Sequence, residues 1–192
     1  MTKLVLTQNE QADQLLAESP LALLIGLVLD QQITLEKAFI APYLLQERLG
    51  EPLDASRLAE IDPSELEKIF AIKPALHRFP ASMAKRVQEI CTVVASQYQN
   101  DASKIWKLAQ DGQDLKNRIN KLPGFGEMKT KIFIALLGKQ LGLSVTGWQE
   151  AAKPFGDPNT FMSIADITDA QSLSRVRQYK AEMKAKSKTA NG

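Results

Sequence analysis

Residues 122–131, of sequence LPGFGEMKTK, combine the residue types of a turn that binds an anion. Pro123 stops the helix before it, while Gly124 and Gly126 can adopt positive φ and let another backbone come close. An apolar-periodic helix begins directly afterwards, so the backbone N–H groups from Gly126 to Lys129 lie at a helix N-terminus, where negative charge is favoured. The segment therefore predicts a seat for a phosphate group.

The elements that position this turn are predicted to be helices. Proline stands at the first turn of three of them, which begin at Pro20, Pro63 and Pro80. Further apolar-periodic segments follow Thr34, Asp54 and Asp101 and run to about residues 49, 61 and 110. No stretch keeps the period-two alternation of a strand. We expect an all-α fold of about nine to eleven helices in a single domain over residues 1–192, with a disordered tail over residues 184–192.

The composition fits a folded protein with one basic side. At 192 residues and 44% hydrophobic content, the chain can bury a core as one compact unit or two closely packed lobes. The net charge of +2 conceals an acidic stretch over residues 47–67 and basic stretches over residues 121–139 and 175–188. Such an asymmetry is typical of a surface that faces nucleic acid, although an ordinary solvated helix face explains residues 175–188 better.

Cysteine and histidine usage limits the chemistry further. The one cysteine, Cys91, falls on an apolar helical stripe and is predicted to be a core residue, which excludes a disulfide within the chain. The one histidine, His77, has no second ligand near it in sequence, so a transition-metal site is not expected. The apolar run over residues 21–29 is too short to span a bilayer and no signal peptide is apparent, so we expect a cytoplasmic protein without a membrane partner and, in solution, a monomer.

Three segments together resemble a known superfamily. Residues 122–131 resemble the second half of a helix-hairpin-helix, residues 27–34 (LVLDQQIT) resemble a Gln-Gln segment that joins two core helices, and residues 83–90 (MAKRVQEI) resemble the helix that leads toward the hairpin. In this order, over roughly residues 20–148, they resemble the helix-hairpin-helix (HhH-GPD) DNA glycosylase superfamily of base-excision repair. The resemblance implies a two-lobed helical bundle that binds double-stranded, damaged DNA in the cleft between its lobes.

The resemblance assigns roles to residues on both sides of that cleft. Gln31 or Gln32 would enter the gap left by a flipped nucleotide or bond to the orphaned base, and we favour this role over the alternative that both are helix-cap amides. Lys129 and Lys131 would bring positive charge to the DNA backbone, beside Met128 and the two hairpin glycines. The backbone carbonyls that would hold a monovalent cation are those of Asn120, Leu122 and Phe125. The four-thiolate iron–sulfur cluster of some members cannot form with one cysteine, and no other cofactor is implied.

The sequence departs from the superfamily at two catalytic positions. Members that cleave the strand carry a lysine nucleophile two residues after the second hairpin glycine, where this chain has Met128. Lys129 follows one position later, about 100° around a helix, so a Schiff base is not expected. The aspartate that follows the hairpin helix corresponds to Thr146, which cannot offset the positive charge of an oxocarbenium-like sugar.

Three other carboxylates could take over, those of Asp30, Glu150 and Asp157. Asp30 interrupts an apolar run at the mouth of the implied cleft, where it could stabilise the sugar cation or activate water. It could equally be the N-cap of the helix that begins near Thr34. Trp148 could stack on an extruded base or serve as a packing anchor.

Two functions from different classes remain open. The first is a monofunctional DNA N-glycosylase, with alkylated purines favoured because a cationic base leaves as a neutral molecule and needs less assistance. The second is a protein that binds damaged DNA on the glycosylase scaffold without chemistry. A weaker third possibility is that the hairpin binds a protein partner.

Overall fold

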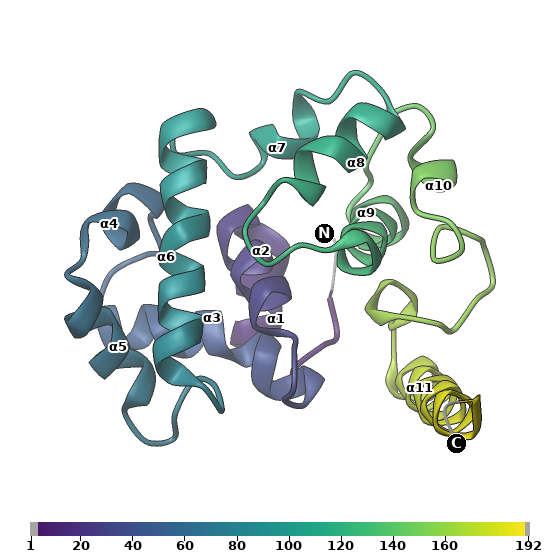
Figure 1. Cartoon of the computed structure of the whole chain (residues 1–192), viewed down its shortest axis with the longest axis horizontal. Helices are drawn as coiled ribbons and strands as arrows, with labels where there is room; N and C mark the ends of the chain where they lie inside the picture. The colour runs from purple at the N-terminus through teal and green to yellow at the C-terminus, as the bar shows by residue number, and fades with distance from the viewer. Residues whose placement is uncertain (1–3, 191–192) are drawn as a thin grey trace.

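The computed structural model describes residues 4–190 (Figure 1). This range contains eleven α-helices, one short 3-10 helix and no strand, which confirms the predicted all-α fold. The elements are α1 (Glu10–Glu18), α2 (Pro20–Leu29), α3 (Leu35–Leu49), α4 (Ala55–Glu60), α5 (Pro63–Ala71), α6 (Pro80–Gln97), α7 (Lys104–Lys107), α8 (Gly112–Asn120), α9 (Glu127–Gln140), α10 (Trp148–Ala151), η1 (Ile164–Asp166) and α11 (Ala170–Ala190).

Helix starts follow the capping residues that the sequence indicates. The Ser19 hydroxyl accepts from the Ala22 N–H at 3.2 Å, and the Asp62 carboxylate accepts from the Ser64 N–H at 2.9 Å. The predicted helix after Asp101 is shorter than expected, since only α7 forms there. The Asp101 carboxylate instead closes a turn by accepting from both the N–H and the hydroxyl of Ser103, at 2.9 and 2.7 Å.

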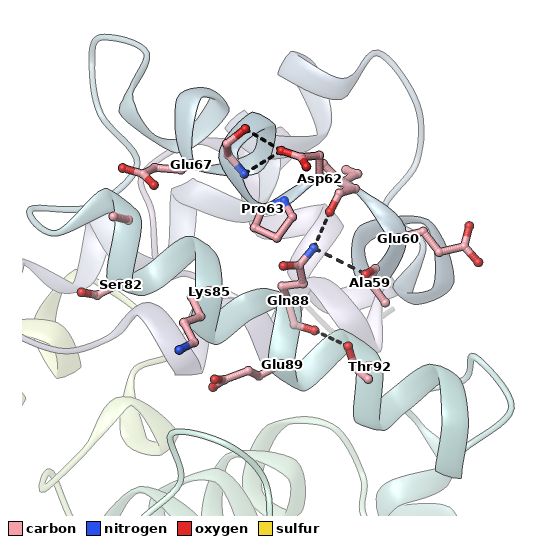
Figure 2. Close-up of a pocket in the computed structure, with 13 residues that line it drawn as sticks. Ala59, Glu60, Asp62, Pro63, Glu67, Ser82, Lys85, Gln88, Glu89 and Thr92 are labelled. Carbon is pink, nitrogen blue, oxygen red and sulfur yellow. Dashed lines mark hydrogen bonds between the residues drawn. The ribbon is translucent and has the colours of Figure 1, made fainter.

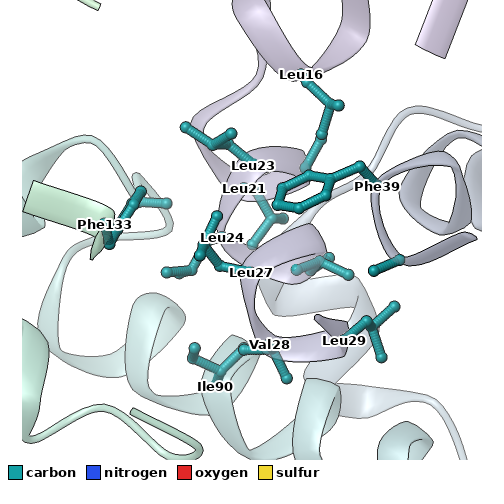
Figure 3. Packing of buried hydrophobic residues seen from close by; sticks show 14 of the residues in the cluster. Leu16, Leu21, Leu23, Leu24, Leu27, Val28, Leu29, Phe39, Ile90 and Phe133 are labelled. Atoms are coloured by element: carbon teal, nitrogen blue, oxygen red, sulfur yellow. The ribbon is translucent and has the colours of Figure 1, made fainter. Parts of the chain in front are cut away.

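Helix α2 joins two groups of helices. On one side α6 packs against α4 and α5, and on the other α9 packs against α8, α10 and η1 (Figure 1). Every residue of α2 from position 21 to position 29 is buried. Figure 3 shows its leucines between Phe39 of α3 and Phe133 of α9. A Cβ on Gly26 would lie 2.8 Å from the Phe39 ring, so this glycine allows α3 to pack closely.

The chain from residue 184 to residue 190 forms the last turns of α11, and residues 191 and 192 lie outside the described range, so the predicted disorder of residues 184–192 stays a prediction. The composition favours a helix there, because residues 181–190 include three alanines and three lysines and hold no glycine or proline. The helix is anchored by buried Val176 and by an ion pair between Arg177 and Glu36 of α3.

Two further predictions can be compared with the structure. Cys91 is fully buried and burial raises the pKa of its thiol to about 12, which confirms a core role. Within residues 4–190, no single helix is long and apolar enough to cross a membrane; α1 and α2 meet that criterion only as a pair bent by 113°.

Candidate functional site

The hairpin between α8 and α9 is held from below by two apolar side chains. Leu122 and Phe125 are buried, and the Phe125 N–H donates to the Leu122 carbonyl at 3.1 Å. Gly124 has a φ of +85°, and a Cβ there would lie 3.2 Å from the Arg86 Cδ atom. Both facts favour glycine at this position, as the sequence predicts.

Gly126 serves a different purpose from the one expected. Its φ of −91° and ψ of 178° are extended backbone that any residue adopts, so the expectation of positive φ is wrong at this position. A Cβ on Gly126 would meet no atom within 4 Å. Gly126 is also the N-cap of α9 and provides no side-chain cap, so the first N–H groups of the helix face an open approach. Glycine at this position therefore leaves room for a ligand to approach the N-terminus of α9.

Lys129 of α9 reaches the end of α2, where its charge and that of Asp30 influence each other. The Lys129 ammonium donates to the Val28 carbonyl at 3.3 Å. Burial raises the pKa of the half-buried Asp30 carboxyl, while the positive charges of Lys180 and Lys129 oppose that rise. Burial lowers the pKa of Lys129, and the Asp30 charge opposes that change. The structure therefore places a carboxylate and an amine, 99 positions apart in the sequence, in one partly desolvated site.

The helix-cap alternative for Asp30 is wrong. Thr34 caps α3 by accepting from the Lys37 N–H at 3.4 Å, whereas Asp30 lies at the C-terminal end of α2. Since Asp30 carries no capping bond to α3, its negative charge is available to the site.

The two glutamines after Asp30 differ in their surroundings. The Gln31 amide donates to the Val28 carbonyl at 2.9 Å and to the Met83 sulfur at 3.3 Å, so it caps the C-terminal end of α2. Gln32 is exposed and has a φ of +57°, an uncommon conformation for a residue other than glycine. Of the two, Gln32 has the amide that is free to contact a partner.

His77 is a site residue that sequence reasoning missed. Its ring is buried, its Nε2 atom lies 2.9 Å from the Gln31 carbonyl, and its Nδ1 atom accepts from the Phe79 N–H at 3.0 Å. No local signal predicts this contact, because 46 positions separate the two partners. In the described part of the chain, no three His, Cys, Asp or Glu side chains come together as a metal site.

A comparison with known families identifies this arrangement. Residues 25–191 match the family model of the HhH-GPD superfamily base excision DNA repair protein. The chain belongs to this superfamily. No curated protein and no solved structure matched the chain. Membership in the HhH-GPD superfamily places the protein in base excision DNA repair and indicates DNA as its partner.

The two hairpin lysines of this HhH-GPD protein face different neighbours. Lys129 reaches α2, whereas Lys131 forms an ion pair with Glu127 at 3.2 Å. Glu127 also pairs with Lys116 of α8 at 3.2 Å. The two lysines diverge because two helical positions correspond to about 200° of rotation. Met128, which precedes Lys129 in the first turn of α9, is 68% exposed.

The position where HhH-GPD enzymes carry aspartate lies on the α8 side of α9. Thr146 lines a cavity of about 580 Å³ together with Lys131 and Glu150, and its carbonyl accepts from the Gly112 N–H at 2.8 Å. Glu150 is exposed and pairs with Lys153 at 2.6 Å. Neither residue lines a common cavity with Asp30. The two carboxylates that line this cavity, those of Asp111 and Glu150, both belong to exposed residues.

The two remaining candidates, Trp148 and Asp157, lie in α10 and in the loop that follows it. Trp148 packs onto Gly138 so closely that a Cβ on that glycine would lie 2.4 Å from the indole ring, which indicates a packing anchor. Asp157 lies in the loop after α10, where its N–H bonds to the Pro154 carbonyl at 3.3 Å.

A larger groove on the α4–α6 side has the wrong charge for phosphate. It measures about 1060 Å³, and Figure 2 shows Glu60, Asp62, Glu67 and Glu89 along it with Lys85 as the only basic side chain drawn. Its floor is held by Gln88, whose amide donates to the Ile61 carbonyl at 2.6 Å. An acidic groove repels the DNA backbone, so this surface is distinct from the hairpin side.

Proposed function

We propose that the protein is a monofunctional DNA N-glycosylase that extrudes a damaged base from double-stranded DNA and hydrolyses its glycosidic bond. The observation that carries this proposal is the half-buried carboxylate of Asp30, beside Lys129 and the Gln-Gln turn. The hairpin N–H groups at Gly126 would bind the DNA phosphate, Gln32 would enter the gap left by the extruded nucleotide, and Met128 would lie against the duplex.

Asp30 suits the electrostatic demand of this reaction. As the glycosidic bond breaks, positive charge develops on the sugar, and a carboxylate in a desolvated site stabilises it more strongly than one in water. Water then adds its oxygen to the anomeric carbon and loses a proton to the carboxylate or to solvent. Glu150, the alternative near Thr146, is solvated and neutralised by Lys153, so it would contribute less.

Lys129 and Lys180 would keep Asp30 ready for this role. Burial favours the protonated carboxylic acid, which cannot stabilise a cation, whereas the two ammonium groups favour the ionised form. The substrate class follows from the same balance. An alkylated purine already carries a positive charge and leaves as a neutral base, so it needs the least help from a carboxylate that neighbouring lysines partly offset.

The hairpin also fits the monovalent cation that the superfamily implies. The Leu122 carbonyl accepts one hydrogen bond, from Phe125, and keeps a second lone pair, and the Asn120 carbonyl is among those at the end of α8 that lack a helical donor. With the Phe125 carbonyl these oxygens are suitable ligands for a hard cation. When bound, the ion would supply positive charge toward a DNA phosphate.

The test compares base release from duplexes that carry an alkylated, a deaminated or an oxidised base. We expect wild type to release the alkylated purine. Asp30→Asn keeps the shape of the side chain but removes its charge, so its rate of base release should be at least tenfold lower. Equal rates for the two proteins would show that Asp30 is structural. Tight binding by wild type to all three duplexes, without release of any base, would establish the alternative of a non-catalytic damage-binding protein.

A second candidate activity is strand cleavage through Lys129, and one observation favours it. Lys129 is close enough to Asp30 for their charges to interact, and burial lowers the pKa of Lys129 toward the free amine that forms a Schiff base. Against this, Asp30 and the Val28 carbonyl stabilise the ammonium form, so for the monofunctional enzyme we expect no adduct with abasic DNA after borohydride treatment. A trapped adduct in wild type that is absent from Lys129→Met would establish the second activity instead.

A further inference from the structure

His77 connects two segments that lie on the Gln-Gln side of the candidate site. It is the one histidine in the chain, and its ring is 1% exposed. One ring nitrogen contacts the backbone of the Gln31–Gln32 turn and the other contacts the backbone of Phe79, which directly precedes α6. A single side chain thus joins the end of α2 to the start of α6.

The chemistry of these two contacts fixes the protonation state of the ring. The Gln31 carbonyl can only accept a hydrogen bond, so the Nε2 atom must carry a proton. The Phe79 N–H can only donate, so the Nδ1 atom must be unprotonated. Of the three states of a histidine, only the neutral Nε2–H tautomer satisfies both bonds. In a charged ring the Nδ1 atom would also carry a proton, so two donors, Nδ1–H and the Phe79 N–H, would face each other.

The groups around the ring favour that neutral state. The carbonyl of Leu29, the last residue of α2, and that of Gln31 in the following turn face the ring, while Lys37 of α3 and Lys129 of α9 add positive charge nearby. Burial lowers the pKa of the imidazole, and the two lysines lower it further, although the carbonyls oppose the change. The two bonds are therefore intact at neutral pH and lost in acid.

The loop before His77 is itself rigidly attached to the protein. The Arg48 guanidinium donates to the Ile69 and Pro74 carbonyls, each at 2.7 Å. Leu76, next to His77, is buried, and its N–H bonds to the Phe70 carbonyl at 2.9 Å. His77 therefore holds the Gln-Gln turn against a fixed support, and the turn includes Gln32 in its uncommon left-handed conformation.

We propose that His77 is a positioning residue that, as the neutral Nε2–H tautomer, holds the Gln31–Gln32 turn in the conformation that presents Gln32 to damaged DNA, an inference that rests on the function proposed above. The side chain touches no substrate. It acts through the backbone of Gln31, and its protonation releases the turn.

The first experiment examines the tautomer directly. Because the chain has one histidine, labelling histidine with ¹⁵N gives one pair of ring-nitrogen signals from the full-length protein. At neutral pH we expect a protonated Nε2 and an unprotonated Nδ1, with a midpoint of titration below the ordinary histidine value. A proton on Nδ1, or rapid averaging between tautomers, would overturn the proposal.

The second experiment measures affinity for a duplex with an abasic-site analogue relative to the same undamaged duplex. In His77→Asn the amide can replace Nδ1 but does not reach Gln31, whereas in His77→Gln the amide can reach the Gln31 carbonyl. We expect the preference for damaged DNA to be about tenfold lower in His77→Asn than in wild type, which corresponds to the loss of one buried hydrogen bond. His77→Gln should retain most of the preference. Retention of the full preference in His77→Asn would overturn the proposal.

Two control variants separate positioning from loss of stability and from failure of the proposed function. Leu76→Ala removes a buried apolar side chain next to His77 in the sequence and leaves both ring hydrogen bonds in place, so it should lower the unfolding temperature without changing the preference. Gln32→Ala should lower the preference by itself. Loss in Gln32→Ala without loss in His77→Asn refutes the role of His77 alone, whereas no loss in either variant refutes the role of the Gln-Gln turn and the His77 proposal with it.

Discussion

The ammonium of Lys129 donates to the backbone carbonyl of Val28 at 3.3 Å, and this bond joins the first turn of α9 to the last turn of α2. The two helices carry the two DNA-contacting segments that the sequence indicates, the hairpin and the Gln-Gln turn. Their spacing is therefore set by a side chain that itself belongs to the proposed site.

The two hairpin glycines should respond differently to alanine. Gly124→Ala should lower the free energy of unfolding by about 1–2 kcal/mol, because its φ is +85° and its Cβ would crowd Arg86. Gly126→Ala should leave stability within about 0.5 kcal/mol, since its backbone is extended, yet weaken binding to every duplex because the new methyl group lies where a phosphate approaches. Chemical denaturation and a salt titration of DNA binding measure the two effects. Unchanged affinity in Gly126→Ala would remove the hairpin from the interface.

Lys129 and Lys131 provide a matched pair for the electrostatics of binding. If Lys129 neutralises a phosphate, Lys129→Gln should reduce the slope of log affinity against log salt by about 1. Lys131→Gln should change the slope less, because Lys131 already pairs with Glu127 at 3.2 Å. Equal changes in the two slopes would indicate a diffuse basic surface rather than a defined contact.

The ionised Asp30 carboxylate should lower the free energy of unfolding at neutral pH, because burial disfavours its charge. Its pKa is raised in the folded protein, so the folded state binds that proton more tightly than the unfolded state, and stability decreases as pH rises through the raised pKa. Asp30→Asn should therefore be as stable as wild type or up to about 1 kcal/mol more stable at neutral pH. The difference should shrink as pH falls toward the ordinary value of 3.8. A variant that is less stable at neutral pH would show that Asp30 is held by favourable contacts.

A buried ion pair attaches the far end of α9. Lys139 lies 2.6 Å from Asp166, whose side chain is 3% exposed and also accepts from the Met162 N–H at 2.8 Å. Lys139→Met leaves that carboxylate without its partner and should destabilise the fold by about 3–5 kcal/mol. Lys116→Met, which breaks the exposed pair with Glu127, should cost less than about 1 kcal/mol. Thermal unfolding would distinguish the two, and equal losses would contradict a structural role for the buried pair.

Local signals explain what the sequence could predict. Caps such as Ser19 and Asp62 fix helix starts through bonds to residues two or three positions ahead. Such capping residues can be recognised in a single sequence because both partners are close together in the chain. The hairpin is equally local, down to the positive φ of Gly124. Helix α11 departs from this pattern, because its lysines resemble a disordered tail in composition while their helix propensity is high.

The site depends on contacts between distant segments, which leave no periodic pattern. His77 and Gln31 are 46 positions apart, and Lys129 and Val28 are 101 apart. Sequence reasoning selected Asp30 as a candidate but could not decide between a cap and a free carboxylate, because that choice depends on which helix its side chain meets. It also grouped Lys129 with Lys131, which α9 turns toward different neighbours.

The burial of α2 has a mechanical consequence. One continuous apolar cluster includes Leu24 of this helix, Ile90 of α6 and Phe133 of α9, so both groups of helices share a core (Figure 3). A hinge between them would expose leucines that each contribute about 1.5–3 kcal/mol when buried. We infer that the two groups of helices form one stiff body. For the glycosylase proposed above, the bending and unstacking that bring a nucleotide to Asp30 would then be borne by the duplex, so DNA with lesions that soften it would be bound at the lowest cost.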